Sequence, residues 1–124
     1  MATILIVEDN PDSMKLFRAV LAARGHTVVA LTGGGGLEDV VRTSAPAIIL
    51  LDIQLPGEDG FQLLERLRAA FPVLPPVVAL TAHAMSGDRE RALDAGFDGY
   101  LTKPIDVVSF GPTVEGMLNT PRTT

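Results

Sequence analysis

The chain has 124 residues, of which 47% are hydrophobic and 20% are charged, which is the composition of an ordinary globular protein of about one domain. Its net charge is −5 and its lysines and arginines are scattered, which excludes the basic footprint of a nucleic-acid-binding protein. There is no cysteine, so disulfides and thiolate metal sites are excluded as well. The sequence shows neither a membrane-length apolar run nor a signal peptide, so we expect a cytoplasmic protein.

Short apolar runs alternate with segments of helical periodicity. The runs are rich in Val, Ile and Leu and lack a strict alternation with polar residues, which indicates strands buried on both faces. In chain order the predicted elements are the strand Thr3–Glu8, the helix Pro11–Arg24, the strand Thr27–Leu31, the helix Leu37–Ser44, the strand Ala47–Asp52, the helix Gly60–Phe71, the strand Pro76–Thr81, the helix Ser86–Ala95, the strand Gly99–Thr102 and a last helix within Val107–Leu118. This succession predicts an α/β fold with a parallel sheet covered by helices on both sides.

Residues at the helix ends support these assignments. Asn10 is a suitable N-cap for the first helix, Pro11 fits its first position, and Gly25 ends it. The helix Leu37–Ser44 has weaker signals and follows four glycines, Gly33–Gly36. No Lys-Ser or Lys-Thr pair follows these glycines, so they do not predict a nucleotide-binding P-loop.

Polar side chains stand where the predicted strands end. Glu8 and Asp9 close the first strand, Asp52 the third, Thr81 the fourth, and Lys103 follows the fifth. Ligands of open parallel sheets bind at the carboxyl ends of the strands. The sequence therefore predicts one site with three carboxylates, a hydroxyl and an ammonium group.

The residue types of this site favour phosphoryl transfer. Clustered carboxylates repel one another and attract a cation, and a set of oxygen ligands without His or Cys suits Mg²⁺, with Mn²⁺ as an alternative. A carboxylate can act as a nucleophile towards phosphorus while a metal and an ammonium group neutralise the transferring oxygens. Asp52 is the predicted acceptor, Lys103 supplies the ammonium group, and Thr81 can donate a hydrogen bond to a phosphoryl oxygen.

Four stretches of the chain resemble the receiver domain of bacterial response regulators. They are Ile-Leu-Ile-Val-Glu8-Asp9-Asn10, Leu50-Leu51-Asp52-Ile53-Gln54-Leu55-Pro56-Gly57-Glu58-Asp59-Gly60, Leu80-Thr81-Ala82 and Tyr100-Leu101-Thr102-Lys103-Pro104. Each motif alone is weak, but together they follow successive strands from about residue 3 to residue 105. The resemblance implies a CheY-like, flavodoxin-like (βα)5 fold with a five-stranded parallel sheet of strand order 2-1-3-4-5.

The resemblance also assigns roles around the acceptor. It implies that Asp52 is phosphorylated, that Asp9 binds Mg²⁺ directly together with Asp52 and the backbone carbonyl of Gln54, and that Glu8 acts through water. Lys103 would bind the acyl phosphate, and the bond to the next residue, Pro104, would be a cis peptide.

Further roles implied by the resemblance lie in the switch. Thr81 and Tyr100 would form a pair in which the hydroxyl moves towards the phosphoryl group and the ring turns inward, although Tyr100 also fits an ordinary half-buried aromatic residue. His83 and the Gln54 side chain would tune the rate at which water attacks the acyl phosphate. For His83, an exposed loop position without function is an equally good interpretation.

In functional terms the resemblance implies a phosphorylation-dependent switch of a two-component system or phosphorelay. Its phosphodonor would be a sensor histidine kinase or a histidine phosphotransfer protein, and a downstream protein would bind a face within residues 84–118. We expect a stand-alone receiver, a monomer or weak dimer, that is not an enzyme with independent small-molecule turnover. A receiver module of a hybrid histidine kinase or longer regulator is the main alternative. A phosphohydrolase, disfavoured because Gln54 replaces a second acid, and a phosphorylation-independent binding module are more remote.

Two features depart from the family pattern. Glu58 occupies a position where an apolar residue is commoner, and it adds negative charge near the site. Gly111, Pro112 and Gly116 fall within the last helix, so we expect a short, kinked or shifted helix at about residues 106–119. The whole chain, residues 1–124, is predicted to be one domain with a core at about residues 3–105 and a flexible tail at 120–124.

Overall fold

The computed structural model describes residues 2–82, 88–103 and 105–118. They form a five-stranded parallel sheet of order β2-β1-β3-β4-β5, which confirms the predicted fold class and strand order. The elements are β1 (Thr3–Val7), α1 (Pro11–Ala23), β2 (Thr27–Leu31), α2 (Leu37–Ser44), β3 (Ile48–Asp52), α3 (Gly60–Ala70), β4 (Val77–Thr81), α4 (Asp88–Ala95), β5 (Gly99–Thr102) and α5 (Val107–Leu118). Across these described residues, no helix is long and apolar enough to cross a membrane.

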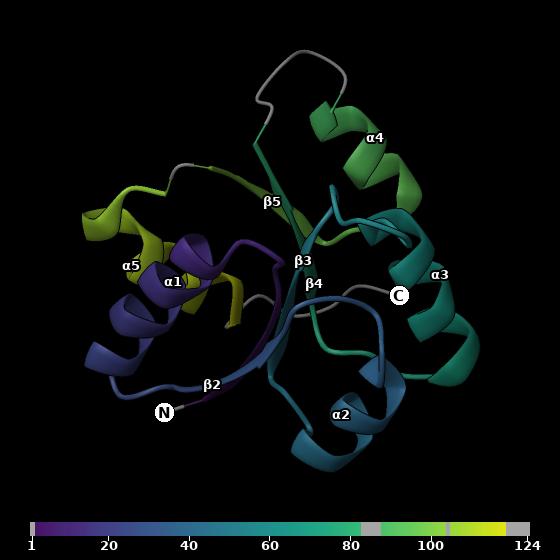
Figure 1. Cartoon of the computed structure of the whole chain (residues 1–124), viewed down its shortest axis with the longest axis horizontal. Coiled ribbons are helices and arrows are strands. Elements are labelled where there is room, and N and C mark those ends of the chain that lie inside the picture. The colour runs from purple at the N-terminus through teal and green to yellow at the C-terminus, as the bar shows by residue number, and fades with distance from the viewer. Residues whose placement is uncertain (1, 83–87, 104, 119–124) are drawn as a thin grey trace.

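Helices cover both faces of the sheet, with α1 and α5 on one side and α2, α3 and α4 on the other (Figure 1). Successive residues of a strand point to opposite faces. In β1, Ile4 and Ile6 join the hydrophobic cluster beneath α1 and α5, whereas Leu5 and Val7 join the cluster beneath α2 and α3. This burial on both faces explains why the strand sequences are apolar throughout.

The N-terminus of α1 is fixed immediately after the acidic pair. The Asn10 side chain accepts hydrogen bonds from the N–H groups of Asp12 and Ser13, at 2.9 and 3.0 Å, and Pro11 takes the first helical position. This confirms Asn10 as the N-cap. The cap satisfies backbone donors that a helix start leaves unpaired, so it sets the point at which the chain turns from the acidic pair into α1.

Several predicted elements extend one residue beyond the observed ones. β1 ends at Val7, which leaves Glu8 just past the strand, and β4 begins at Val77 rather than at Pro76. Proline has no N–H to donate to a sheet, whereas the N–H of Val77 donates to Asp98 Oδ2 at 2.8 Å. The predicted start of the fourth helix at Ser86 lies outside the described residues.

The Gly111–Pro112 step does not divide the last helix. α5 is helical from Val107 to Leu118 and contains Pro112. Pro112 removes the helical hydrogen bond to the carbonyl of Val108, a residue that is 84% exposed, so water can replace that bond. The helix therefore has its predicted extent, while a kink stays a prediction and the tail at 120–124 lies outside the described residues.

The carboxylate of Glu115 ties α5 to the turn between α1 and β2. Arg24 donates two hydrogen bonds to it, at 2.8 and 2.7 Å, and the Nε2 atom of His26 lies 2.8 Å from Oε2 of Glu115. The Arg24 side chain crosses α5 at Gly111, where a Cβ atom would lie 2.2 Å from Arg24 Cδ. Glycine at this position makes room for the arginine.

This ion-pair cluster predicts a pH effect on stability. Hydrogen bonds from Arg24 and His26 lower the pKa of Glu115 from an ordinary 4.5 to about 2. Because the folded-state pKa is depressed, the stability that Glu115 contributes is present above pH 4.5 and is lost as the pH falls towards 2. We expect Glu115→Gln to lower Tm modestly at neutral pH, and this loss to shrink between pH 4.5 and 2.

Thermal unfolding followed by circular dichroism measures this effect across the pH range. Glu65→Gln, which changes an exposed carboxylate on α3, is the matched control and should leave Tm nearly unchanged. A Tm loss in Glu115→Gln that is the same at every pH would contradict the prediction.

Candidate functional site

Three acidic side chains meet at the carboxyl edge of the sheet. β1 and β3 pair in register with Val7 beside Leu51, and this places Glu8 and Asp9 next to Asp52. Carboxylate oxygens of these three acids lie within 4.8 Å of one another. Glu8 and Asp52 are buried, at 1% and 2% exposure, whereas Asp9 is open to solvent. The structure therefore brings together the three predicted carboxylates.

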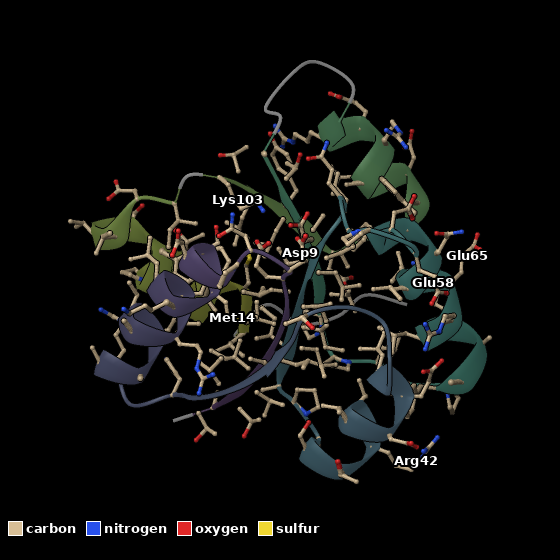
Figure 2. All side chains as sticks on the ribbon, viewed as in Figure 1. Asp9, Met14, Arg42, Glu58, Glu65 and Lys103 are labelled. Atoms are coloured by element: carbon tan, nitrogen blue, oxygen red, sulfur yellow. The ribbon has the colours of Figure 1, made fainter. Side chains whose placement is uncertain are left out.

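Lys103 joins two of these acids. Its backbone N–H donates to the Thr81 carbonyl at 2.7 Å, which anchors the residue at the end of β5 beside β4. Its Nζ donates to Oε1 of Glu8 and to Oδ2 of Asp52, both at 2.8 Å. Figure 2 shows Lys103 and Asp9 at the same edge of the sheet. The predicted ammonium group is thus the internal counter-ion of the two buried carboxylates.

Backbone N–H groups hold the remaining oxygens of the buried pair. The N–H of Asn10 donates to Oε2 of Glu8 at 3.1 Å, and the N–H of Gln54 donates to Oδ1 of Asp52 at 2.8 Å. The described part of the chain contains no buried side-chain nitrogen or oxygen without a partner. The orientation of both carboxylates is fixed by these bonds, as buried charges require.

Burial and charge act against each other in this cluster. Burial raises the pKa of Glu8, and its hydrogen bond from Lys103 only partly offsets the rise. Burial alone would lower the pKa of Lys103, but the hydrogen bonds to Asp52 and Glu8 outweigh it, so the pKa of the lysine is raised and the side chain stays cationic.

The predicted switch pair lies on one face of the sheet. Thr81 is fully buried at the end of β4, and Tyr100 of β5 pairs with Ala79, two residues earlier in β4. Residues two apart along a strand share a face, so Thr81 and Tyr100 both point towards the side covered by α3 and α4. The Tyr100 ring is half-buried and packs against the hydrophobic cluster there. Movement of either side chain stays a prediction.

The other predicted residues fall into two groups. Gln54 lies in the site through its N–H, and its side chain is exposed. His83 and Pro104, and with Pro104 the predicted cis bond, lie outside the described residues. Glu58 forms an ion pair with Arg66 of α3, so the negative charge that it was expected to bring to the site is neutralised.

The donor set fits a divalent cation. It consists of oxygen atoms only, one of the carboxylates is open to solvent, and three negative charges face the single ammonium group of Lys103. Hard cations such as Mg²⁺ prefer one or two carboxylates and keep several waters, which an exposed Asp9 allows. Asp9 and Asp52 are therefore the residues that would hold Mg²⁺ directly.

Comparison with protein families agrees with this site. The model of the response regulator receiver domain matches residues 4–111, which include every residue of the carboxyl-edge site. The chain belongs to this family. It is a receiver domain of two-component signalling, as the order of its strands and the placement of its acids indicate.

Two curated relatives are similar in sequence to this receiver domain. It is 38% identical over 117 residues to the polar-differentiation response regulator DivK of Brucella anthropi, covering 94% of this chain and 95% of DivK. It is 42% identical over 106 residues to the sensor protein GacS of Pseudomonas syringae pv. syringae, covering 82% of this chain and 12% of GacS.

One solved structure bears on the metal. The receiver domain of the sensor histidine kinase PA1611 from Pseudomonas aeruginosa matches with a TM-score of 0.84 and 32% identity, over 96% of this chain and 98% of that one. That receiver domain has a magnesium ion coordinated in its active-site cleft.

Proposed function

We propose that this receiver domain is a switch operated by phosphorylation of Asp52, with a phosphohistidine of a sensor kinase or a histidine phosphotransfer protein as donor. The observation that carries the proposal is the position of Lys103, whose Nζ lies 2.8 Å from both Asp52 and Glu8. The ammonium group of Lys103 therefore lies beside the buried carboxylate of Asp52. An ion pair that served stability alone would not need the third, exposed carboxylate of Asp9.

The proposed reaction transfers one phosphoryl group. An Asp52 oxygen attacks phosphorus, the phosphorus–nitrogen bond of the phosphohistidine breaks, and the imidazole leaves with a proton from solvent. Lys103, already bonded to Asp52, would keep its ammonium group on the acyl phosphate, and Thr81 would donate to another phosphoryl oxygen. Mg²⁺, when bound by Asp9 and Asp52, neutralises charge on the transferring oxygens.

Reversal of the switch needs only water. Water attacks phosphorus of the acyl phosphate, orthophosphate leaves, and the Asp52 carboxylate is restored. Gln54 and His83 are proposed to set the rate of this step. Consumption of a small donor is therefore limited by hydrolysis of the acyl phosphate at Asp52, and we propose no independent small-molecule turnover beyond that.

The output is proposed to be a change of surface. Phosphorylation adds about one negative charge and three acceptor oxygens at Asp52. A shift from 1:99 to 99:1 between two states requires about 5.5 kcal/mol. Lys103 is hydrogen-bonded to Asp52 before phosphorylation as well, so only a strengthening of that bond counts towards the shift. A new charge-assisted hydrogen bond from Thr81, at about 1.5–3 kcal/mol, would supply part of it. A protein that binds the phosphorylated form, through a face within residues 84–118, would complete it.

The relatives support both a stand-alone receiver and a module of a larger protein. The alignment with DivK covers 95% of that response regulator, which favours a stand-alone switch. The alignment with GacS covers 12% of that sensor protein, which keeps a receiver module of a hybrid kinase as the second candidate. The proposed chemistry at Asp52 is the same in both.

Intact-mass spectrometry tests the proposal. After incubation with Mg²⁺ and acetyl phosphate or phosphoramidate, the protein is expected to gain one phosphoryl group, and removal of Mg²⁺ by a chelator is expected to prevent the gain. Asp52→Asn should gain none, whereas Asp94→Asn, at an exposed position of α4, should be labelled normally. Labelling of Asp52→Asn would refute the proposed switch. Rapid turnover of the donor, much faster than slow hydrolysis of an accumulated phosphoprotein, would favour a phosphohydrolase instead.

A further inference from the structure

Arg66 of α3 connects three segments that are distant in the sequence. Its guanidinium donates to both carboxylate oxygens of Glu38 in α2, to the Gly34 carbonyl at 3.0 Å, and to Oε1 of Glu58. Glu58 belongs to the loop between β3 and α3, which follows Asp52. One side chain therefore joins the loop beside the phosphorylation site to α2 and to the loop between β2 and α2.

The glycine run at residues 33–36 is part of this arrangement. A Cβ atom on Gly34 would lie 2.6 Å from Leu63 Cδ2, 2.8 Å from Arg66 Nη1 and 3.2 Å from Glu58 Oε1. A side chain at this position would displace the ends of these side chains, so glycine lets the loop pass directly over the Arg66–Glu58 pair as both are placed here. Of the four glycines, Gly34 is the one that packs against this ion pair.

The loop between β3 and α3 carries a residue of the proposed metal site. The N–H of Gln54 donates to Asp52, and the Gln54 carbonyl is the expected backbone ligand of Mg²⁺. At its other end the loop is held by the reciprocal hydrogen bonds of Asp59 and Gln62, which cap α3. Between Gln54 and Asp59, the Glu58 side chain connects the loop to α3 by accepting a hydrogen bond from Arg66.

We propose that Arg66 is a positioning residue for the phosphorylation site. Through Glu58 it holds the loop between β3 and α3 in the conformation that binds Mg²⁺, and through Glu38 it connects that loop to α2. This inference rests on the proposed function of Asp52 and its Mg²⁺ site. Arg66 acts on the site only through the loop.

Geometry and charge both support this role. The Arg66 side chain is 29% exposed, so its ion pairs are partly shielded from water and salt. A planar guanidinium can bond two carboxylates and a carbonyl at fixed angles, which a lysine ammonium group cannot match. The hydrogen bonds from Arg66 lower the pKa of Glu38, as expected for a carboxylate paired with a guanidinium group.

Two effects of losing Arg66 have opposite signs. A looser loop would hold the Gln54 carbonyl less firmly and weaken Mg²⁺ binding. A Glu58 carboxylate freed from its partner would add negative charge near the site and strengthen Mg²⁺ binding. Positioning and simple electrostatics are therefore distinguishable by the direction of the change in Mg²⁺ affinity.

The experiment compares Arg66→Met, Arg66→Lys and Arg42→Met by nuclear magnetic resonance. Methionine keeps the apolar stem of the arginine, and lysine keeps the charge without the fork. Arg42 is the control because it is an exposed arginine of α2 that pairs with Asp39 and lies far from Asp9 (Figure 2). Mg²⁺ is titrated while the amide signals of Asp52 and Gln54 are followed, and amide hydrogen exchange of the loop is measured without Mg²⁺.

We expect Arg66→Met to raise the Mg²⁺ Kd about threefold to tenfold, less than the roughly 10- to 100-fold of a direct partner of a metal ligand. Arg66→Lys should fall between it and the unsubstituted protein, and Arg42→Met should bind Mg²⁺ normally. Amides of the loop should exchange faster in Arg66→Met alone. Adding Glu58→Gln to Arg66→Met should raise the Mg²⁺ Kd only slightly further, because the contact is already lost and the second change removes only the freed charge of Glu58.

An unchanged or lowered Kd in Arg66→Met, in a folded protein, would overturn the positioning role and leave the proposed function intact. Unchanged exchange of the loop amides would overturn it as well, by a measurement that needs no metal. Failure of the unsubstituted protein to bind Mg²⁺ would overturn the proposed function and this inference together.

Discussion

Lys103→Met is expected to slow the phosphorylation of Asp52 by roughly 100- to 1,000-fold, the usual cost of removing one donor aimed at developing negative charge. Lys103 is the residue whose Nζ contacts Asp52, at 2.8 Å. Methionine preserves the length of the side chain and removes the charge. The initial rate of labelling by phosphoramidate at saturating Mg²⁺, followed by intact mass, measures the effect.

The same substitution should change Mg²⁺ binding in the opposite direction. Without the ammonium group, the carboxylates of Glu8, Asp9 and Asp52 face one another with no internal cation, so their need for Mg²⁺ increases. Lys103→Met is therefore expected to bind Mg²⁺ more tightly while reacting more slowly. Lys15→Met, at an exposed position of α1, is the control. A variant of Lys103 that is labelled at close to the normal rate would show that the lysine has no part in the transfer.

The sequence predicts the fold and most of the site because both follow local rules. Each strand is a short apolar run, and the acids, the threonine and the lysine directly follow these runs. In a parallel sheet, residues that follow strands must come together at one edge. The positions of Asp9, Asp52 and Lys103 relative to the strand ends are therefore enough to predict that their side chains lie close together.

Contacts between long side chains are not predictable in this way. The sequence places Glu8 and Lys103, 95 residues apart, in one site but does not predict that they pair, and nothing in it links Arg66 to Glu38 and Glu58. Such pairs depend on rotamers and on the angles at which helices cross, and many arrangements share the same apolar pattern. The sequence predicted that Glu58 would add negative charge to the site, and only the structure shows the arginine that neutralises it.

The last helix shows that the intrinsic helix propensity of a segment also fails to predict its structure. Gly111 and Pro112 both lower the intrinsic helix tendency of Val107–Leu118, and yet the segment is helical throughout. Tertiary contacts decide the outcome, because Phe110 stacks on Phe17 of α1 and Arg24 occupies the space that Gly111 leaves. Gly111 lowers helix propensity, and in this fold it makes room for the Arg24 side chain.

Phe17→Ala is expected to destabilise the protein by about 3–5 kcal/mol, the range measured for truncating buried aromatic residues. Phe17 is 1% exposed, and its ring lies 5.3 Å from that of Phe110, so the change removes a contact between α1 and α5 as well as buried area. Since domains are stable by only about 5–15 kcal/mol, this loss is a large share of the total.

Urea unfolding followed by circular dichroism measures the change in the free energy of unfolding. Leu16→Ala is the matched control, because Leu16 is the neighbouring residue of the same helix and is 37% exposed. Similar losses in the two variants would contradict the role of the Phe17–Phe110 contact. A larger loss in Phe17→Ala is expected because Phe17 lies in the core cluster that joins α1, which begins beside Asp9, to α5, which follows Lys103, so the two elements flanking the carboxyl-edge site share one part of the core.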